Sequence, residues 1–301
     1  MGFIFKVPAI PVVTGKGYFG GGSPSGAEID GLIFATETSN NPAAVLSVAR
    51  DSLAGVNSST RGYFCGGYTT SYVFSSEIEG IQFDNESAIN PTAVLSVGKS
   101  RLAGVNSSTR GYVGGGSTGG FAAAYNSTVD GIRFDTEAAV AGVQGLSIDR
   151  NRLTGVNSST RGYFAGGSVS SGDVAVIDGL EFSTELRVTL LAALTIARKS
   201  LAGVNSSTRG YFCGGEMGGS PTAEIDGIRF DTDAVINPVA TLAFARAYLA
   251  GVNSIVSGYI GGGTSGTAIY SLLFDTESTA TSTATLSTTR YDLAGLQSGS
   301  L

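Results

Sequence analysis

The chain of 301 residues contains no histidine and no tryptophan, and only 14% of its residues are charged. Histidine is the commonest general base and the commonest zinc ligand, so its absence argues against an enzyme and against a zinc site. Phosphate binding needs clustered Lys and Arg, and a net charge of −6 without such a cluster argues against a nucleic-acid partner. We therefore expect a protein that binds without catalysis, with no cofactor and no metal.

Long apolar segments are also missing. No apolar run approaches ~18 residues, so no membrane insertion is predicted. The opening MGFIFKVPAIPVV is apolar, but Lys6, Pro8 and Pro11 interrupt it and no small-residue cleavage site follows, which does not match a signal peptide. We interpret residues 1–13 as an N-terminal apolar arm that packs on the rest of the chain or contacts a neighbouring subunit.

What the chain has in abundance is glycine, 45 residues of it, and repetition. The segment LAGVNSSTRGYF at 53–64 returns almost unchanged at 102–113, 153–164 and 201–212. Its glycine has equivalents 44–51 residues apart, the spacing of propeller blades. These anchors are Gly55, Gly104, Gly155, Gly203, Gly251 and Gly295.

Each repeat holds four short strand-like runs and no segment that requires a long helix. In the first complete repeat they are A at 53–57, B at 63–67, C at 78–83 and D at 93–97. The last A run, at about 293–297, has no B run after it, whereas the chain starts with a B run at 15–22 that has no A run before it. The two complete one blade. We therefore predict an all-β, six-bladed β-propeller over residues 14–301, with four antiparallel strands per blade and a C-terminal A strand that closes the ring on the N-terminal blade.

The order R-x-x-LAGV, GYF-x-GG, I-D-G-I-x-F-D-T-E, then a D run that ends in Arg, resembles the kelch repeat over residues 14–301. The shared features are the diglycine after strand B and the aromatic–acid pair at the end of strand C. They occur at Gly66–Gly67, Gly166–Gly167, Gly214–Gly215, Phe83–Asp84, Phe134–Asp135, Phe230–Asp231 and Phe274–Asp275. The chain lacks the kelch Trp of strand D, and the functions of that family are diverse.

Loop lengths distinguish two faces of the predicted ring. The A–B and C–D loops keep their lengths, whereas the distance from the Gly before Tyr to the acidic position of strand C varies from 12 to 19 residues. The B–C and D–A loops emerge at the same end of a blade, and in kelch proteins that bind partners these loops commonly form the ligand face. The resemblance implies the same here. The candidate binding residues on this face are Tyr68, Tyr72, Phe74, Arg101, Phe121, Tyr125, Arg152 and Tyr248.

Alternatives remain for these sites. The aromatic residues can instead fold back on their own long loops. The repeated NSSTR segments predict turns capped by their own side chains, and the rival is a multivalent lectin that uses them. Its residues would be Asn57, Asn106, Asn157 and Asn205 with Arg61, Arg110, Arg161 and Arg209. The DTE turns have too few oxygens for calcium, so turn capping is expected there too.

A constant spacing of twenty residues separates an acid of strand C from a base after strand D. It predicts structural ion pairs within each blade: Asp30–Arg50, Glu79–Lys99, Asp130–Arg150, Asp178–Arg198 and Asp226–Arg246. In the sixth blade Tyr270 would stand beside Arg290 in place of the acid. Cys65 and Cys213 lie three blades apart, too far for a disulfide, and should be free buried thiols.

The sequence therefore favours a non-enzymatic binding or structural propeller whose partner is a protein or glycan. The low-charge, Gly/Ser/Thr/Ala-rich and nearly identical repeats resemble those of virion tail, capsid-associated and adhesin proteins. This resemblance implies a virion or an extracellular surface as the location.

Overall fold

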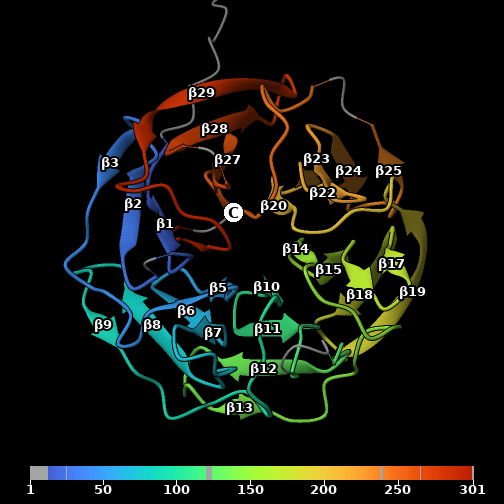
Figure 1. Ribbon diagram of the computed structural model, residues 1–301, viewed down its shortest axis with the longest axis horizontal. Coiled ribbons are helices and arrows are strands. Elements are labelled where there is room, and N and C mark those ends of the chain that lie inside the picture. Colours follow the sequence, from blue (N-terminus) through green and yellow to red (C-terminus); the bar gives the residue numbers. More distant parts are fainter. Residues whose placement is uncertain (1–12, 25, 120–123, 238–239, 265, 300–301) are drawn as a thin grey trace, which may run out of the picture.

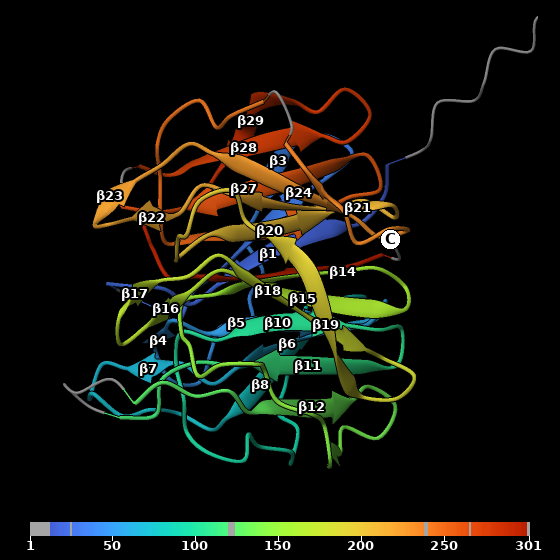
Figure 2. The ribbon, with the colours of Figure 1, turned by 90° about the vertical axis from the view of Figure 1, so that its right-hand side faces the viewer.

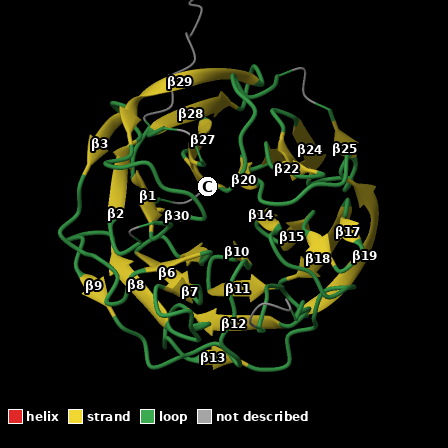
Figure 3. Cartoon of the chain, viewed as in Figure 1, coloured by secondary structure: helices red, strands yellow, loops and turns green. Residues whose placement is uncertain are grey.

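The computed structural model describes residues 13–24, 26–119, 124–237, 240–264 and 266–299. Among them it contains strands, turns and loops but no helix (Figure 3). Six four-stranded antiparallel sheets stand around a central axis and form a six-bladed β-propeller, as predicted (Figure 1). Of the predicted arm, residues 1–12 lie outside the described residues, and Val13 packs against a buried cluster between the sixth and first blades.

Within each blade, strands A to D run from the axis outward. Blade 1 consists of β30 (Ala294–Gln297), β1 (Lys16–Gly20), β2 (Ile29–Ile33) and β3 (Thr38–Asn40). Blade 2 consists of β5 (Ala54–Asn57), β6 (Arg61–Cys65), β8 (Ile78–Gln82) and β9 (Ala88–Ile89). Blade 3 consists of β10 (Ala103–Asn106), β11 (Arg110–Gly114), β12 (Val129–Arg133) and β13 (Ala139–Val140). Blade 4 consists of β14 (Thr154–Asn157), β15 (Arg161–Ala165), β18 (Val176–Glu181) and β19 (Leu186–Ala193). Blade 5 consists of β20 (Ala202–Asn205), β21 (Arg209–Cys213), β24 (Ile225–Arg229) and β25 (Val235–Ile236). Blade 6 consists of β26 (Leu249–Asn253), β27 (Ser257–Gly262), β28 (Ala268–Leu273) and β29 (Ser278–Thr285).

The ring closes where the sequence predicted. Strand β30 pairs antiparallel with β1, from Gly17 opposite Gln297 to Gly20 opposite Ala294. The first blade thus takes its inner strand from one end of the described chain and its other three strands from the opposite end, which leaves no open edge at the closure.

Strand D lies earlier in the chain than expected. The run at 93–97 was predicted as strand D of the second blade, but that strand is β9 (Ala88–Ile89), which starts soon after the C–D turn. Of the expected run, only Val94 forms a β-bridge, to Glu77. Nine residues therefore lie between the end of β9 and Lys99, and they lead from this blade toward the next, where Lys99 meets Asp130.

Neighbouring inner strands approach one another through glycine. At the anchor glycine of every A strand, an added Cβ would lie under 3.0 Å from the carbonyl oxygen of the anchor glycine in the preceding blade. Gly155, for example, faces the carbonyl oxygen of Gly104, and Gly295 faces that of Gly251. Real Cβ atoms do not come this close to backbone, so only glycine fits at these positions.

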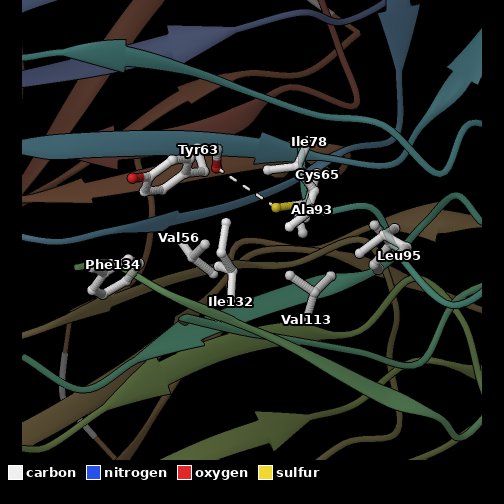
Figure 4. Close-up of a cluster of buried hydrophobic side chains, with 11 residues drawn as sticks. Val56, Tyr63, Cys65, Ile78, Ala93, Leu95, Val113, Ile132 and Phe134 are labelled. Carbon is white, nitrogen blue, oxygen red and sulfur yellow. Dashed lines mark hydrogen bonds between the residues drawn. The ribbon is translucent and has the colours of Figure 1, made fainter. Parts of the chain in front are cut away.

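Buried side chains fill the space between blades. Figure 4 shows one such cluster, in which Tyr63 and Cys65 of the second blade meet Ile132 and Phe134 of the third. The Tyr of each B strand stacks on the Phe that follows strand C of the next blade, with ring centroids 5.4–5.8 Å apart at all six interfaces. Such offset aromatic pairs add stabilisation beyond the burial of their area.

The DTE turns between strands C and D hold adjacent blades together. The third residue of each turn has a positive φ of 50–58° and accepts a hydrogen bond from the Tyr hydroxyl of the preceding blade. Glu137, for example, accepts from Tyr63 at 3.0 Å and pairs with Arg61 at 2.9 Å. These acceptors are Glu37, Glu86, Glu137, Glu185, Asp233 and Glu277. The turns are thus structural, but they join blades and do not merely cap themselves.

The predicted ion pairs within blades are wrong, because five of the six bases pair with the acid of the following blade and the sixth, Arg246, meets Tyr270 there. Arg150 lies 3.0 Å from Asp178, and Lys99 lies 2.8 Å from Asp130. The observed pairs are Arg50–Glu79, Lys99–Asp130, Arg150–Asp178, Arg198–Asp226 and Arg290–Asp30. In place of the predicted intrablade pairs Asp30–Arg50, Glu79–Lys99, Asp130–Arg150, Asp178–Arg198 and Asp226–Arg246, the same residues link neighbouring blades.

The cause of this error is the stretch of chain after strand D. Strand D does return to the end where strand C begins, but the base is not on that strand. The residues that follow carry it across the boundary between blades. Tyr270 consequently lies under Arg246 of the preceding blade and not beside Arg290. Burial opposes ionisation of Asp130, but the ammonium group of Lys99 outweighs it, and the pKa of Asp130 is lowered.

The predicted free thiols are confirmed. Cys65 and Cys213 are both unpaired and fully buried. Burial raises the pKa of each thiol to about 12, so neither is a reactive thiolate at neutral pH.

The close approach of the inner strands predicts a cost for any side chain there. Gly155→Ala should lower the free energy of unfolding by about 3 kcal/mol or more, because its Cβ meets a backbone carbonyl that cannot move aside. Gly142→Ala is the control, since it has a φ of +82° but nothing within 4 Å of the new Cβ, and should cost about 1 kcal/mol. Chemical denaturation measures both. Equal losses would contradict the steric explanation.

The pairing between blades predicts which residues couple. Arg150→Met or Asp178→Asn alone should each cost about 3–5 kcal/mol, because the partner charge is left buried. A double-mutant cycle should show strong coupling between Arg150 and Asp178, and less than about 0.5 kcal/mol between Arg150 and Asp130. Strong coupling of Arg150 with Asp130 would instead restore the pairing within a blade.

Candidate functional site

The candidate site is the end of the propeller that carries the B–C and D–A loops, here called the variable face. Two of the B–C loops contain small hairpins, β16 (Ser168–Val169) with β17 (Gly172–Asp173) and β22 (Glu216–Met217) with β23 (Ser220–Pro221). These hairpins lie on the left in Figure 2, and the C-terminus lies on the right. The A–B loops and C–D turns form the opposite end, the constant face.

The D–A and B–C loops are tied to each other. In the second blade β4 (Arg50–Asp51) pairs with β7 (Tyr68–Thr69). Equivalent single bridges join the D–A and B–C loops of four other blades, at Ser23–Tyr291, Ser100–Ser117, Asn151–Ser168 and Lys199–Glu216. The loops that vary in sequence are therefore fixed to one another by backbone hydrogen bonds.

At the centre of the variable face, six residues of the D–A loops form a closed ring, which we call the axial ring. Each donates its backbone N–H to the carbonyl oxygen of its counterpart in the preceding blade, at 2.7–3.1 Å. All six have a positive φ of 56–64°, and their side chains line a depression of about 50 Å³. The axial ring comprises Ser52, Arg101, Arg152, Ser200, Tyr248 and Asp292. The sequence showed these positions to be variable, but it did not reveal that they bond to each other.

The axial ring brings together three of the predicted binding residues. Arg101, Arg152 and Tyr248 lie in it, all partly exposed, and the guanidinium of Arg152 stands over the ring of Tyr248 at 5.5 Å. The hydroxyl of Tyr248 donates to Glu216 of a neighbouring B–C loop. Asp292 adds a carboxylate, so that acidic and basic groups share the mouth of the channel.

Carboxylates at this mouth resist ionisation. Burial and the neighbouring Asp51 carboxylate raise the pKa of Asp292 to about 6, although Arg152 and Arg101 oppose the shift. Burial also raises the pKa of Asp51. The charge of the axial ring therefore becomes more positive between neutral and mildly acidic pH.

A second group of predicted residues forms an aromatic cluster at the edge of the variable face. Tyr68 contacts Tyr72 with ring centroids 5.8 Å apart and Phe74 at 4.9 Å. Tyr68 and Phe74 are partly buried, but Tyr72 is 77% exposed. Two of these aromatics thus fold against their own loop, while the third stays accessible.

In the third blade, the predicted site is described only in part. Tyr125 is partly exposed and forms a β-bridge with Ser117. Phe121 lies outside the described residues.

The NSSTR segments of the constant face are turns capped by their own side chains, as predicted. Ser58 Oγ accepts from the backbone N–H groups of Thr60 and Arg61 at 3.2 and 3.1 Å. The Asn residue that precedes the first Ser has a further role, which the sequence did not predict. Each of Asn57, Asn106, Asn157, Asn205, Asn253 and Gln297 donates its backbone N–H to the side-chain oxygen of the next, at 2.7–3.5 Å, in a closed asparagine ring.

The asparagine ring and adjacent serines line a single depression of about 340 Å³ on the axis. Each side-chain oxygen of the asparagine ring thus accepts a backbone N–H of its neighbour, and the first Ser of each turn bonds to its own backbone, so these repeated groups are already hydrogen-bonded. The Arg residues Arg61, Arg110, Arg161 and Arg209 are also occupied, in ion pairs with the C–D turns.

In the described part of the chain, the Cys, Asp and Glu residues form no group of three or more that could hold a metal ion. None of the elements there is a helix long and apolar enough to cross a membrane. Comparison with protein-family models and with curated proteins finds no match to this chain.

The raised pKa of Asp292 predicts a pH-dependent stability. The folded protein binds this proton more tightly than the unfolded chain, so its contribution is full below pH about 4 and is lost as the pH rises through about 6. Asp292→Asn should therefore be more stable than the natural chain by about 1–3 kcal/mol at neutral pH, and equally stable in acid.

Denaturation curves across this pH range provide the measurement. Asp84→Asn, which changes an exposed carboxylate of a C–D turn, is the control. Parallel pH profiles of Asp292→Asn and the unsubstituted protein would contradict the prediction.

Proposed function

We propose that the protein is a non-enzymatic binding propeller that engages a protein or glycan through its variable face. The observation that carries this proposal is the composition of the axial ring. Positive φ favours glycine, and the chain uses glycine at many other such positions, for example Gly66 and Gly67. In the axial ring all six residues keep a side chain, and the set is mixed: two Ser, two Arg, one Tyr and one Asp.

The C–D turns show the same backbone feature with a different use of the side chain. There too, residues other than glycine hold a positive φ, and each carboxylate bonds to the neighbouring blade. The strained backbone conformation is retained there because the side chain makes this hydrogen bond. In the axial ring the backbone already makes the contact between blades, so the partly exposed side chains of Arg101 and Arg152 are not needed for it.

We also propose that the chain is an outlying kelch-like propeller and a component of a virion tail or capsid, or an adhesin. The positive φ of both residues of the diglycine supports the first part, since that motif then reflects a backbone requirement. The low charge and nearly identical repeats support the second. A multivalent lectin that uses the repeated NSSTR loops remains the alternative. Its candidate sites are two depressions on the constant face, one on the axis and one lined by Ser158–Thr160, Ser207–Arg209 and Arg229–Asp231.

Stoichiometry and surface variants test the two. A glycan array and a panel of surface proteins supply the ligands, and biolayer interferometry measures affinity. The variable-face variant is Tyr72→Ser with Arg101→Ser, a residue that the axial ring already uses at Ser52 and Ser200. The matched constant-face variant is Ser59→Ala with Ser207→Ala.

We expect one ligand per ring and a loss of about tenfold or more only in the variable-face variant, since exposed aromatic and Arg anchors dominate such interfaces. Several ligands per ring, with loss only in the constant-face variant, would support the lectin and refute the proposal.

A further inference from the structure

One of the six blade interfaces lacks its carboxylate. Five interfaces pair a base with an Asp or Glu of the following blade. At the interface between blades 5 and 6, the base is Arg246 and the acidic position holds Tyr270, opposite Ile260 as Asp226 is opposite Phe212. The described residues place no carboxylate within ion-pair distance of Arg246.

Arg246 also differs from the other bases in its exposure. Arg50 is 1% exposed, and the other four paired bases are fully buried. Arg246 is partly exposed. Its guanidinium stands over the Tyr270 ring at 4.9 Å, and Nη1 donates to the Gly262 carbonyl at 3.2 Å. A cation–π contact uses the flat face of the guanidinium and leaves N–H groups at its edge for another acceptor.

A second donor belongs to the same arrangement. At four interfaces the acid also accepts the backbone N–H of the residue three positions before the base, at 3.0–3.2 Å. The equivalent residue before Arg246 is Ala243, and no acceptor for its N–H is found among the described residues. The Arg246 guanidinium and the Ala243 N–H therefore correspond to the two groups that bind a carboxylate at other interfaces, but no carboxylate of the described residues binds them.

The surroundings also differ from those of the other interfaces. Two residues before five of the six bases lies an exposed apolar side chain, and Val48, Val97, Ile148 and Ile196 are 36–41% exposed. At the fifth such position Phe244 is 66% exposed. An exposed aromatic beside an Arg without an acidic partner is the combination that protein interfaces favour.

We propose that the interface between blades 5 and 6 binds an external carboxylate, the Asp or Glu side chain of a protein partner, through Arg246 and the N–H of Ala243. The ligand then supplies the charge that the other five interfaces carry internally. Guanidinium and carboxylate form charge-assisted hydrogen bonds with a defined geometry. The site deepens the proposed function and rests on it only for the identity of the partner as a protein.

Acetate is the first probe, with acetamide as the uncharged control at constant ionic strength. The backbone amide signal of Ala243 in NMR spectra reports binding in every variant. We expect acetate to shift this signal in the unsubstituted protein, and its apparent Kd to be about tenfold weaker or worse in Arg246→Gln and in Tyr270→Asp, which supplies an internal acid. Tyr270→Phe and Arg229→Gln, which removes an exposed charge elsewhere, should keep the response.

Two outcomes of the acetate titration would overturn the site. No shift in the unsubstituted protein, or an unchanged response in Arg246→Gln, would overturn the site; the latter variant decides the matter if Tyr270→Asp does not fold. N-acetylglutamate N-methylamide and glucuronate then separate the sources, and a response to glucuronate alone would overturn the assignment to a protein partner. The acetate titration needs no knowledge of the natural ligand, so its result is independent of whether the whole variable face binds.

Discussion

The contact on which the propeller depends is the approach of each inner-strand glycine to the carbonyl oxygen of the preceding inner strand. Only a residue without Cβ permits it, and it sets how far each blade stands from the axis. The two closed rings follow from it. The axial ring residue lies three positions before the glycine, as Arg152 does before Gly155, and the asparagine ring residue lies two positions after it, as Asn157 does. The faithful repetition of LAGVN is therefore required by the distance between strands.

Farther from the axis, each interface repeats the same set of contacts. The Tyr–Phe stack fills the middle, the carboxylate of the C–D turn bonds across the constant face, and at five interfaces a buried ion pair lies toward the variable face. A buried pair adds little net stability over apolar packing, but a mismatched pair is costly. The pairs thus help to fix the register between blades, and the interface with Tyr270 forgoes one of them.

The architecture could be predicted from the sequence because its signals are local and repeated six times. The split blade at the two ends even predicted the closure of β30 on β1. The ion pairs could not be assigned, because a constant spacing of twenty residues is equally compatible with a partner in the same blade or in the next. The decision depended on where strand D ends, and a run such as 93–97 has the composition of a strand although only Val94 forms a bridge.

The candidate site was predictable to a similar degree. Loop lengths identified the variable face, and Arg101, Arg152 and Tyr248 were found there by residue type. That these residues bond to one another through their backbones could not be foreseen, since it requires a positive φ at residues other than glycine and partners about fifty positions away. The position of Arg246 was equally hidden, because it depends on which acid each base meets.

The two closed rings differ in the direction in which their hydrogen bonds run. In the axial ring each residue donates to the preceding blade, whereas in the asparagine ring each donates to the following blade, so the two rings are homodromic and circulate in opposite senses. Dipoles placed head to tail around a closed circle sum to nearly zero, unlike those aligned along a helix. The in-plane dipoles of the two rings therefore largely cancel, and the two mouths differ in their side chains: uncharged Asn and Ser at one end, and Arg101, Arg152, Asp51 and Asp292 at the other.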